Sequence, residues 1–417
     1  MLSNYFHAPF TLRRFRDSTV GGHLDAFATS LSAVGYSRAT ARTYLRAVVH
    51  LGGWAQQRKL PLASMDEEAL RRFRRHFSRC RCGWRENKGG FHSAGRGVAL
   101  FVAYLRECEV VPVAKVVVAQ APFEDELARF RLWMIQRRGL APSTVRLYEA
   151  HVLPLLEALG CDSSAYEAVA IQRFVIKHLG SRGRSEARLC SVALRAYLRC
   201  LVAEGRVVPS LVHCVPTVPQ WRLSSLPRYL EAADVERVIA SCDVSTKEGL
   251  RDRAILLLLA RLGLRAGDVV AMKVDDVDWL RSSLRVCGKA RRETLLPLPQ
   301  DAGDALLAYL ERGRPRVPLG QLFLTVRPPT RPFTTSASVS TLVSVALKRA
   351  GIENPPSRGA HLLRHSAATA MLRAGSDYET ISVVLRHRSP DSTAHYAKVD
   401  VAMLLKVAQP WPGSSSC

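Results

Sequence analysis

Six residues in the second half of this sequence have the chemistry needed to transfer a phosphoryl group: Arg265, Lys289, His361, Arg364, His387 and Tyr396. A phosphodiester under attack gains negative charge on its non-bridging oxygens, and two guanidinium groups can bind those oxygens bidentately. A tyrosine hydroxyl can act as the nucleophile and become covalently linked to the phosphorus. We therefore predict a phosphoryl-transfer site in which Tyr396 is the nucleophile.

Two proton transfers must accompany such an attack. The ordinary pKa of a phenol is near 10, so Tyr396 needs a nearby histidine, or the field of the arginines, to lose its proton at neutral pH. The leaving 5′-oxygen needs a proton, and Lys289, in a basic turn, is a candidate for the acid. Because the protein–phosphate bond would conserve the bond energy, rejoining would need no ATP.

The sequence contains none of the motifs typical of other phosphate chemistries. It has no Gly-x₄-Gly-Lys-Ser/Thr loop for ATP, and its second half has no acidic cluster for two metal ions. We therefore expect catalysis without a metal ion or another cofactor.

The elements predicted to position the six residues are mainly helices. Gly263 is expected to end a helix over 250–262, which leaves Arg265 in the junction before a short helix. Lys289 lies in the turn of a predicted hairpin formed by Ser283–Cys287 and Glu293–Leu298. Periodicity predicts further helices over 232–241, 266–272, 301–312, 336–350, 363–374, 377–386, 391–397 and 400–408.

The first half of the sequence contains two copies of one helical pattern. The segment from Gly35 to Tyr44 matches the segment from Gly139 to Tyr148, and later pairs of segments match in the same order. Each copy is longer than a solenoid repeat, so we predict two similar domains. Four prolines between 209 and 227 predict a linker. The expected organisation is a lead-in segment (1–17), two helical domains (18–115 and 116–215), a linker (216–226), a catalytic domain (227–408) and a tail (409–417).

The charge of the chain favours a polyanionic partner. There are 60 Lys and Arg residues against 36 Asp and Glu, a net charge of +24. Such an excess in a multi-domain chain indicates nucleic acid. We see no apolar run long enough to cross a membrane and no secretory signal, and the scattered cysteines are typical of reduced thiols. We therefore expect a cytoplasmic, nucleoid-associated protein that binds double-stranded DNA and no membrane.

Several arginines are candidates for contacts to DNA phosphates. Ser37 and Ser143, or the threonines beside them, are expected to cap helices whose starts attract phosphate, while Tyr44 and Tyr148 are expected in the core. Between residues 71 and 88, basic residues alternate with aromatic ones, although a solvated helix face would explain them too. The predicted DNA-binding residues are Arg38, Arg42, Arg71, Arg75, Arg146, Arg291 and Arg292.

The same basic window contains His76, Cys80, Cys82 and His92. A Cys-x-Cys pair is tighter than the usual zinc-ligand spacing, and the sequence has only one such pair. We therefore predict unpaired thiols here and no metal site.

The second half resembles the tyrosine recombinase (phage integrase) family. Leu262-Gly-Leu-Arg265-Ala-Gly-Asp is similar to its first arginine box, and Gly288-Lys289 to its hairpin lysine. His361-Leu-Leu-Arg364 is similar to its His-x-x-Arg box, Leu385-Arg-His387 to its second histidine box, and Tyr396 lies where the nucleophile belongs.

This resemblance implies a mainly α fold with a small β-sheet in the catalytic domain, preceded by two helical SAM-like DNA-binding domains. It implies a site-specific recombinase that forms a 3′-phosphotyrosine and works as a homotetramer on two paired DNA sites. The family has glycine where this chain has Arg386, and glycine would permit a turn or a close backbone approach. His365 is expected to have a structural role.

Three alternatives remain open at this stage. An integrase-derived transposase of a mobile element would share the chemistry, and a type IB topoisomerase would relax supercoils without a specific site. A non-catalytic DNA-binding protein is favoured only by Arg386.

Overall fold

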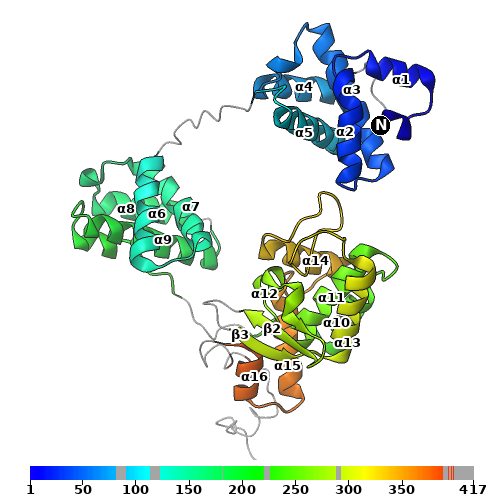
Figure 1. The fold of residues 1–417 in the computed structure, drawn as a ribbon. Coiled ribbons are helices and arrows are strands. Elements are labelled where there is room, and N and C mark those ends of the chain that lie inside the picture. Colours follow the sequence, from blue (N-terminus) through cyan, green and yellow to red (C-terminus); the bar gives the residue numbers. More distant parts are fainter. Residues whose placement is uncertain are drawn as a thin grey trace, which may run out of the picture. The chain divides into compact units, whose positions relative to one another are not determined.

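The computed structural model describes residues 1–80, 91–112, 123–180, 182–219, 226–287 and 293–387, together with Thr393, Tyr396 and Lys398 (Figure 1). These residues are mostly helical, and one three-stranded sheet lies in the second half, which confirms the predicted fold class. The chain divides into two compact units, residues 115–224 on the one hand and 1–114 with 225–417 on the other. In the part of the chain that the structure describes, no helix is both long and apolar enough to cross a membrane.

Residues 1–112 enclose one hydrophobic core. Its centre is α3, which carries Tyr44 and Trp54 inward and packs along α5. Ser37 caps α3, because its side chain accepts the Thr40 N–H at 3.3 Å, as predicted. The elements are η1 (Leu2–Asn4), α1 (Pro9–Arg16), α2 (Gly21–Ala33), α3 (Arg38–Gln57), η2 (Leu62–Ser64), α4 (Glu67–Arg79) and α5 (Phe91–Glu107).

The segment 1–17 belongs to this core and is not a separate lead-in. It forms η1 and α1 and buries Leu2, Tyr5, Phe6 and Phe15 among the side chains of the first helical domain. Its helices are too short for a periodic pattern to be visible in the sequence.

The unit 115–224 has its own helical core. The elements are α6 (Glu124–Arg138), α7 (Pro142–Leu159), η3 (Ser163–Ala165), α8 (Ala168–Leu179), α9 (Arg184–Ala203) and η4 (Pro209–Cys214). The predicted cap at Ser143 is wrong, since α7 begins one residue earlier at Pro142, whose fixed φ suits the first helical position. Glu126 is 3% exposed and accepts hydrogen bonds from Tyr197 Oη at 2.8 Å and Arg206 NH1 at 2.7 Å.

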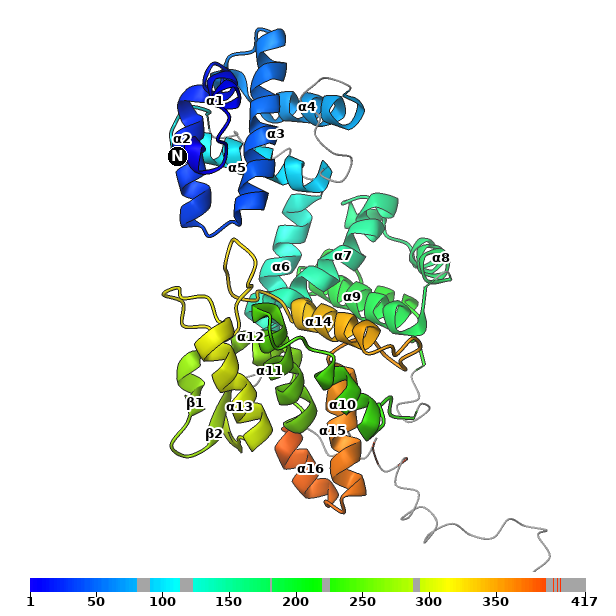
Figure 2. The same ribbon diagram turned by 90° about the vertical axis from the view of Figure 1, so that its right-hand side faces the viewer.

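Residues 226–387 form a third core around α11. The apolar run Ile255–Ala260 is buried in it, and α11 packs against both α13 and α15 (Figure 2). The helices are α10 (Ala232–Ala240), α11 (Lys247–Arg261), α12 (Ala266–Ala271), η5 (Val274–Asp276), α13 (Gln300–Ala308), the π-helix η6 (Tyr309–Gly313), α14 (Ser336–Arg349), α15 (His361–Arg373) and α16 (Tyr378–Leu385).

The sheet of this third core is antiparallel in the order β1 (Val277–Asp278), β2 (Ser283–Cys287), β3 (Glu293–Pro297). Ser283 pairs with Pro297 and Cys287 with Glu293, which confirms the predicted hairpin. The turn between them, with Lys289, Arg291 and Arg292, lies outside the described residues. The same holds for the helix predicted over 400–408, the tail, and most of the helix predicted over 391–397.

Candidate active site

Arg364 is held between the ends of two other helices. It lies in the first turn of α15, and its side chain is 3% exposed. Its NH1 donates to the carbonyl oxygen of Gly263, just after α11, and its NH2 donates to that of Leu385, the last residue of α16. These two bonds fix the guanidinium, and its other N–H groups are left for further acceptors.

Gly263 makes this close approach possible. Its φ of +56° lies in the left-handed region, which residues other than glycine rarely adopt. A Cβ atom built there would lie only 2.3 Å from Leu385 Cδ2. The predicted turn at Gly263 therefore also lets the ends of α11 and α16 meet at Arg364.

Arg265 stands at the start of α12, at the helix junction that the sequence predicts. Its backbone N–H donates a hydrogen bond to Asp268 Oδ2 at 3.0 Å. An acidic residue three positions into a helix commonly accepts such a bond. Its guanidinium NH2 donates to the carbonyl oxygen of Arg386 at 2.8 Å. Arg265 lies close enough to Arg364 to repel its positive charge. Burial, followed by this repulsion, lowers the pKa of Arg364 to about 10.

Arg386, where the resembled family has glycine, adopts the backbone conformation that glycine would favour. It follows α16 with φ 54° and ψ 52°. Its NH2 group donates to Asp268 Oδ2 at 2.6 Å, and the two side chains are only 9% and 7% exposed. The buried ion pair thus links α16 to α12 and holds the strained residue in place.

Tyr396 is 2% exposed and lies among histidines. Its hydroxyl is hydrogen-bonded to His365 Nδ1 at 2.7 Å. Its ring stacks on that of His387, with centroids 6.3 Å apart and an interplanar angle of 6°. Burial raises the pKa of Tyr396 to about 12, although the nearby Arg364 opposes this shift.

The two predicted histidines differ in their surroundings. His387 Nδ1 is hydrogen-bonded to Thr393 Oγ1 at 2.7 Å, and burial, followed by Arg364 and Arg265, lowers its pKa to about 4. His361 begins α15, and partial desolvation with the same two arginines lowers its pKa. Both rings are therefore neutral at pH 7, and the arginines carry the positive charge of the site.

Five of the six predicted residues are thus brought together, four of them from three helix junctions, and the sixth, Lys289, lies outside the described residues. Two members of the site were not among them. His365 contacts the tyrosine hydroxyl, and its position four residues after His361 on one helix face was a usable signal. Asp268 is three residues after Arg265, a typical capping position.

The predicted DNA-binding arginines are mostly on the surface. Arg38, Arg71, Arg75 and Arg146 are exposed, and both Arg71 and Arg75 contact Glu68. Arg42 is half-buried, with its guanidinium over the ring of Phe6. Contact of these residues with DNA remains a prediction.

Known proteins that are similar to this chain are integrases and recombinases. Residues 228–403 match the model of the Phage integrase family. A Sinorhizobium fredii (strain NBRC 101917 / NGR234) protein named as an integrase/recombinase, y4rA, is 32% identical over 99% of both chains. Tyrosine recombinase XerD of Listeria monocytogenes serotype 4b (strain F2365) is 28% identical over 66% of this chain and 94% of its own.

Solved structures show the same fold. XerH site-specific recombinase bound to palindromic difH substrate, in a post-cleavage complex, matches with a TM-score of 0.56 and 18% identity. The match covers 84% of this chain and 99% of XerH. A lambda integrase dimer bound to a COC' core site matches with a TM-score of 0.53 and 18% identity, over 70% of this chain and 98% of its own.

Proposed function

This chain belongs to the phage integrase family of tyrosine recombinases, and we propose that it cuts and rejoins specific DNA sites through a 3′-phosphotyrosine at Tyr396. The observation that carries the proposal is the position of the Tyr396 hydroxyl, buried against His365 and beside the Arg364 guanidinium. A buried phenol that is hydrogen-bonded to a histidine and lies beside a guanidinium group is suited to attack an anion.

In the proposed cleavage step, Arg265 and Arg364 bind the non-bridging oxygens of the scissile phosphate. The bond from Tyr396 Oη to phosphorus forms as the bond from phosphorus to the 5′-oxygen breaks. Charge that grows on the phosphoryl oxygens is stabilised by guanidinium groups that the helix ends already hold in place. Rejoining reverses these steps, with a 5′-hydroxyl as the attacking group, and no metal ion or ATP takes part.

Tyr396 needs a proton acceptor for this reaction. With a pKa of about 12, only about one phenol in 10⁵ would be ionised at pH 7. We assign the acceptor role to His365, whose Nδ1 lies 2.7 Å from the hydroxyl. The proton for the leaving 5′-oxygen is assigned to Lys289, which lies outside the described residues.

Duplex DNA is the proposed substrate, bound by the excess positive charge of the chain. Solved relatives include a lambda integrase tetramer bound to a Holliday junction, and we propose that this chain also acts as a homotetramer on two sites. Because chromosomal or mobile DNA is the substrate, we place its action in the cytoplasm, at the nucleoid.

The non-catalytic alternative loses its main support in this geometry. It rested on Arg386, which adopts the left-handed conformation that glycine would have and leaves the ring of the adjacent His387 stacked on Tyr396. We therefore propose an active enzyme.

Covalent trapping tests the proposal. Nicked duplexes from the DNA that flanks the gene, from which a short cleaved strand diffuses away, are mixed with the full chain in the presence of chelator and run on a denaturing gel. We expect a protein–DNA band for the wild type and for the control Tyr378→Phe, and none for Tyr396→Phe. A band that persists in Tyr396→Phe would show that another residue is the nucleophile.

A plasmid-relaxation assay tests the topoisomerase alternative. A type IB topoisomerase would relax a plasmid of unrelated sequence as fast as one that carries the flanking DNA. A site-specific recombinase should act on the second plasmid alone.

A further inference from the structure

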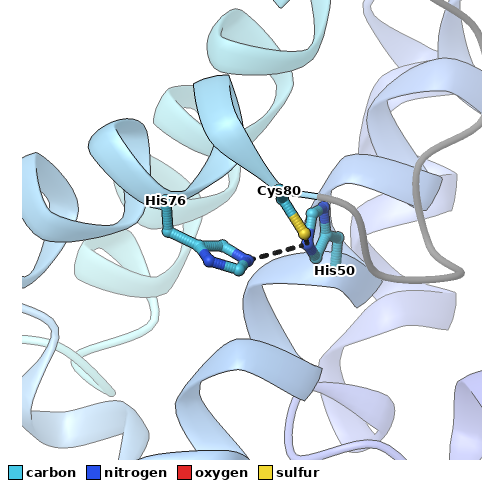
Figure 3. Close-up of side chains that lie close together, drawn as sticks. All are labelled: His50, His76 and Cys80. Carbon is cyan, nitrogen blue, oxygen red and sulfur yellow. Dashed lines mark hydrogen bonds between the residues drawn. The ribbon is translucent and has the colours of Figure 1, made fainter.

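Two histidines and a cysteine meet in the first helical domain, at residues that the proposed reaction does not use. His50 lies on α3, His76 in the last turn of α4, and Cys80 directly after α4 (Figure 3). His50 Nε2 lies 3.2 Å from His76 Nε2 and 3.6 Å from Cys80 Sγ. The three atoms all lie within 4.8 Å of one another.

These distances match the edges of a tetrahedral zinc site. With zinc–nitrogen bonds of about 2.05 Å and a zinc–sulfur bond of about 2.3 Å, tetrahedral angles place two nitrogens about 3.3 Å apart and a nitrogen and sulfur about 3.6 Å apart. The two printed edges, 3.2 Å and 3.6 Å, agree with these values to about 0.1 Å. Two sides of the triangle formed by the three donor atoms thus have the lengths expected around one zinc ion, and the third side, between His76 and Cys80, is at most 4.8 Å.

The cluster is largely shielded from water. His50 is 2% exposed and Cys80 is 6% exposed, and the rings of Phe73 and Phe77 lie against His50. Neutral imidazole and thiolate are the forms that bind zinc.

A hydrogen bond between the two imidazoles would account for the His50–His76 distance alone. A second hydrogen bond would account for the 3.6 Å contact of Cys80 Sγ with the same nitrogen, but one imidazole nitrogen has a single proton or a single lone pair and cannot make both bonds in full. A metal ion accounts for the positions of all three groups together.

We propose that His50, His76 and Cys80 bind one zinc ion. Binding replaces the thiol proton, and water or a further donor completes the tetrahedron. The ion would tie the C-terminal end of α4 to the middle of α3. The sequence favoured unpaired thiols because it showed only the Cys-x-Cys pair, and His50 is 26 residues before His76.

Zinc bound at this site would affect α4, the helix that carries Arg71 and Arg75. Both arginine side chains are largely exposed, while Phe73 between them is buried in the core. A metal link at the end of α4 would hold this basic face in one orientation. If the proposed function is correct, zinc should strengthen DNA binding; the metal site itself does not depend on that function.

The first test is elemental analysis of the full chain, purified without chelator and with any metal-binding tag removed. We expect about one zinc ion per chain in the wild type and in the controls His23→Asn and Cys108→Ser, which change a histidine and a cysteine of the same domain outside the cluster. His76→Asn and Cys80→Ser should lose most of the zinc, with circular dichroism to check folding. His76 is only half-buried, so this variant is the one expected to fold.

A second measurement does not depend on any variant. Cobalt replacing zinc in the wild type should give the intense visible bands of a tetrahedral site and a sulfur-to-cobalt charge-transfer band. Folded wild type that contains no zinc and shows neither signal would refute the proposal. Zinc that persists in both His76→Asn and Cys80→Ser would show that the metal is bound elsewhere and would refute the assignment.

Discussion

Replacing Asp268 should lower the stability of the site more than replacing its partner Arg386. The two side chains form an ion pair at 2.6 Å and are at least nine-tenths buried, so solvent screens the pair little. Asp268→Asn keeps the shape but leaves Arg386 next to Arg265 and Arg364 without a carboxylate. Losing one partner of a buried pair costs about 3–5 kcal/mol, and we expect that loss here.

Arg386→Gly should cost less for two reasons. Glycine relieves a left-handed backbone, which for other residues costs about 1–2 kcal/mol. Asp268 also keeps its hydrogen bond from the Arg265 N–H and the field of the two remaining arginines. We expect a net loss of about 1–3 kcal/mol. In the double variant neither charge is left unpaired, so its cost should be well below the sum of the two single costs.

Hydrogen exchange of peptides from α12 and α16 measures these losses. It reports local opening free energies and does not require the whole multi-domain chain to unfold in one step. Covalent trapping adds a functional measurement. Arg265 is held by the backbone carbonyl of residue 386, which glycine retains, so Arg386→Gly should cleave within about tenfold of the wild-type rate.

An Arg386→Gly loss as large as that of Asp268→Asn would contradict this reasoning. Strictly additive costs in the double variant would contradict it too, because they would mean that the two side chains do not interact in solution.

Three further predictions concern other parts of the chain. Gly263→Ala should cost about 2–5 kcal/mol, from a strained φ and a clash with α16, while the control Gly267→Ala, whose added Cβ meets nothing within 4 Å, should be neutral or stabilising in thermal melts. Glu126→Gln should destabilise its domain by about 1–3 kcal/mol in hydrogen exchange, because the half-buried Arg206 loses its charged hydrogen-bond acceptor. His365→Ala should slow single-turnover cleavage about 10²–10⁴-fold at pH 7, and this deficit should shrink as the pH rises towards the Tyr396 pKa of about 12.

The elements that sequence predicted well are those with local causes. Glycine readily adopts the left-handed conformation that ends a helix, as Gly263 does after α11, so the junction at Arg265 was predictable. The hairpin follows from the strand pattern and the turn. Arg265, His361, Arg364 and His387 were likewise readable, because a helix start or end places each of them.

The features that sequence missed depend on contacts between distant segments. His365 meets the hydroxyl of Tyr396, which is 31 residues further along the chain, only in the folded protein. His50 meets His76 only when α3 and α4 pack, and no local spacing signals that contact. The Arg386–Asp268 pair likewise joins residues 118 positions apart, so only the folded chain shows how a bulky residue is accommodated there.

The way Arg364 is held has a consequence for how such enzymes diversify. Its guanidinium donates hydrogen bonds to two main-chain carbonyl oxygens, those of Gly263 and Leu385. A main-chain carbonyl is present whatever the side chain. Substitutions across the surrounding helices can therefore accumulate while the phosphate-binding group keeps its place. Related enzymes could then evolve new DNA targets while the chemistry stays intact. A mutant library designed to change the DNA target can vary residues whose side chains do not contact Arg364, provided that residue 263 stays glycine.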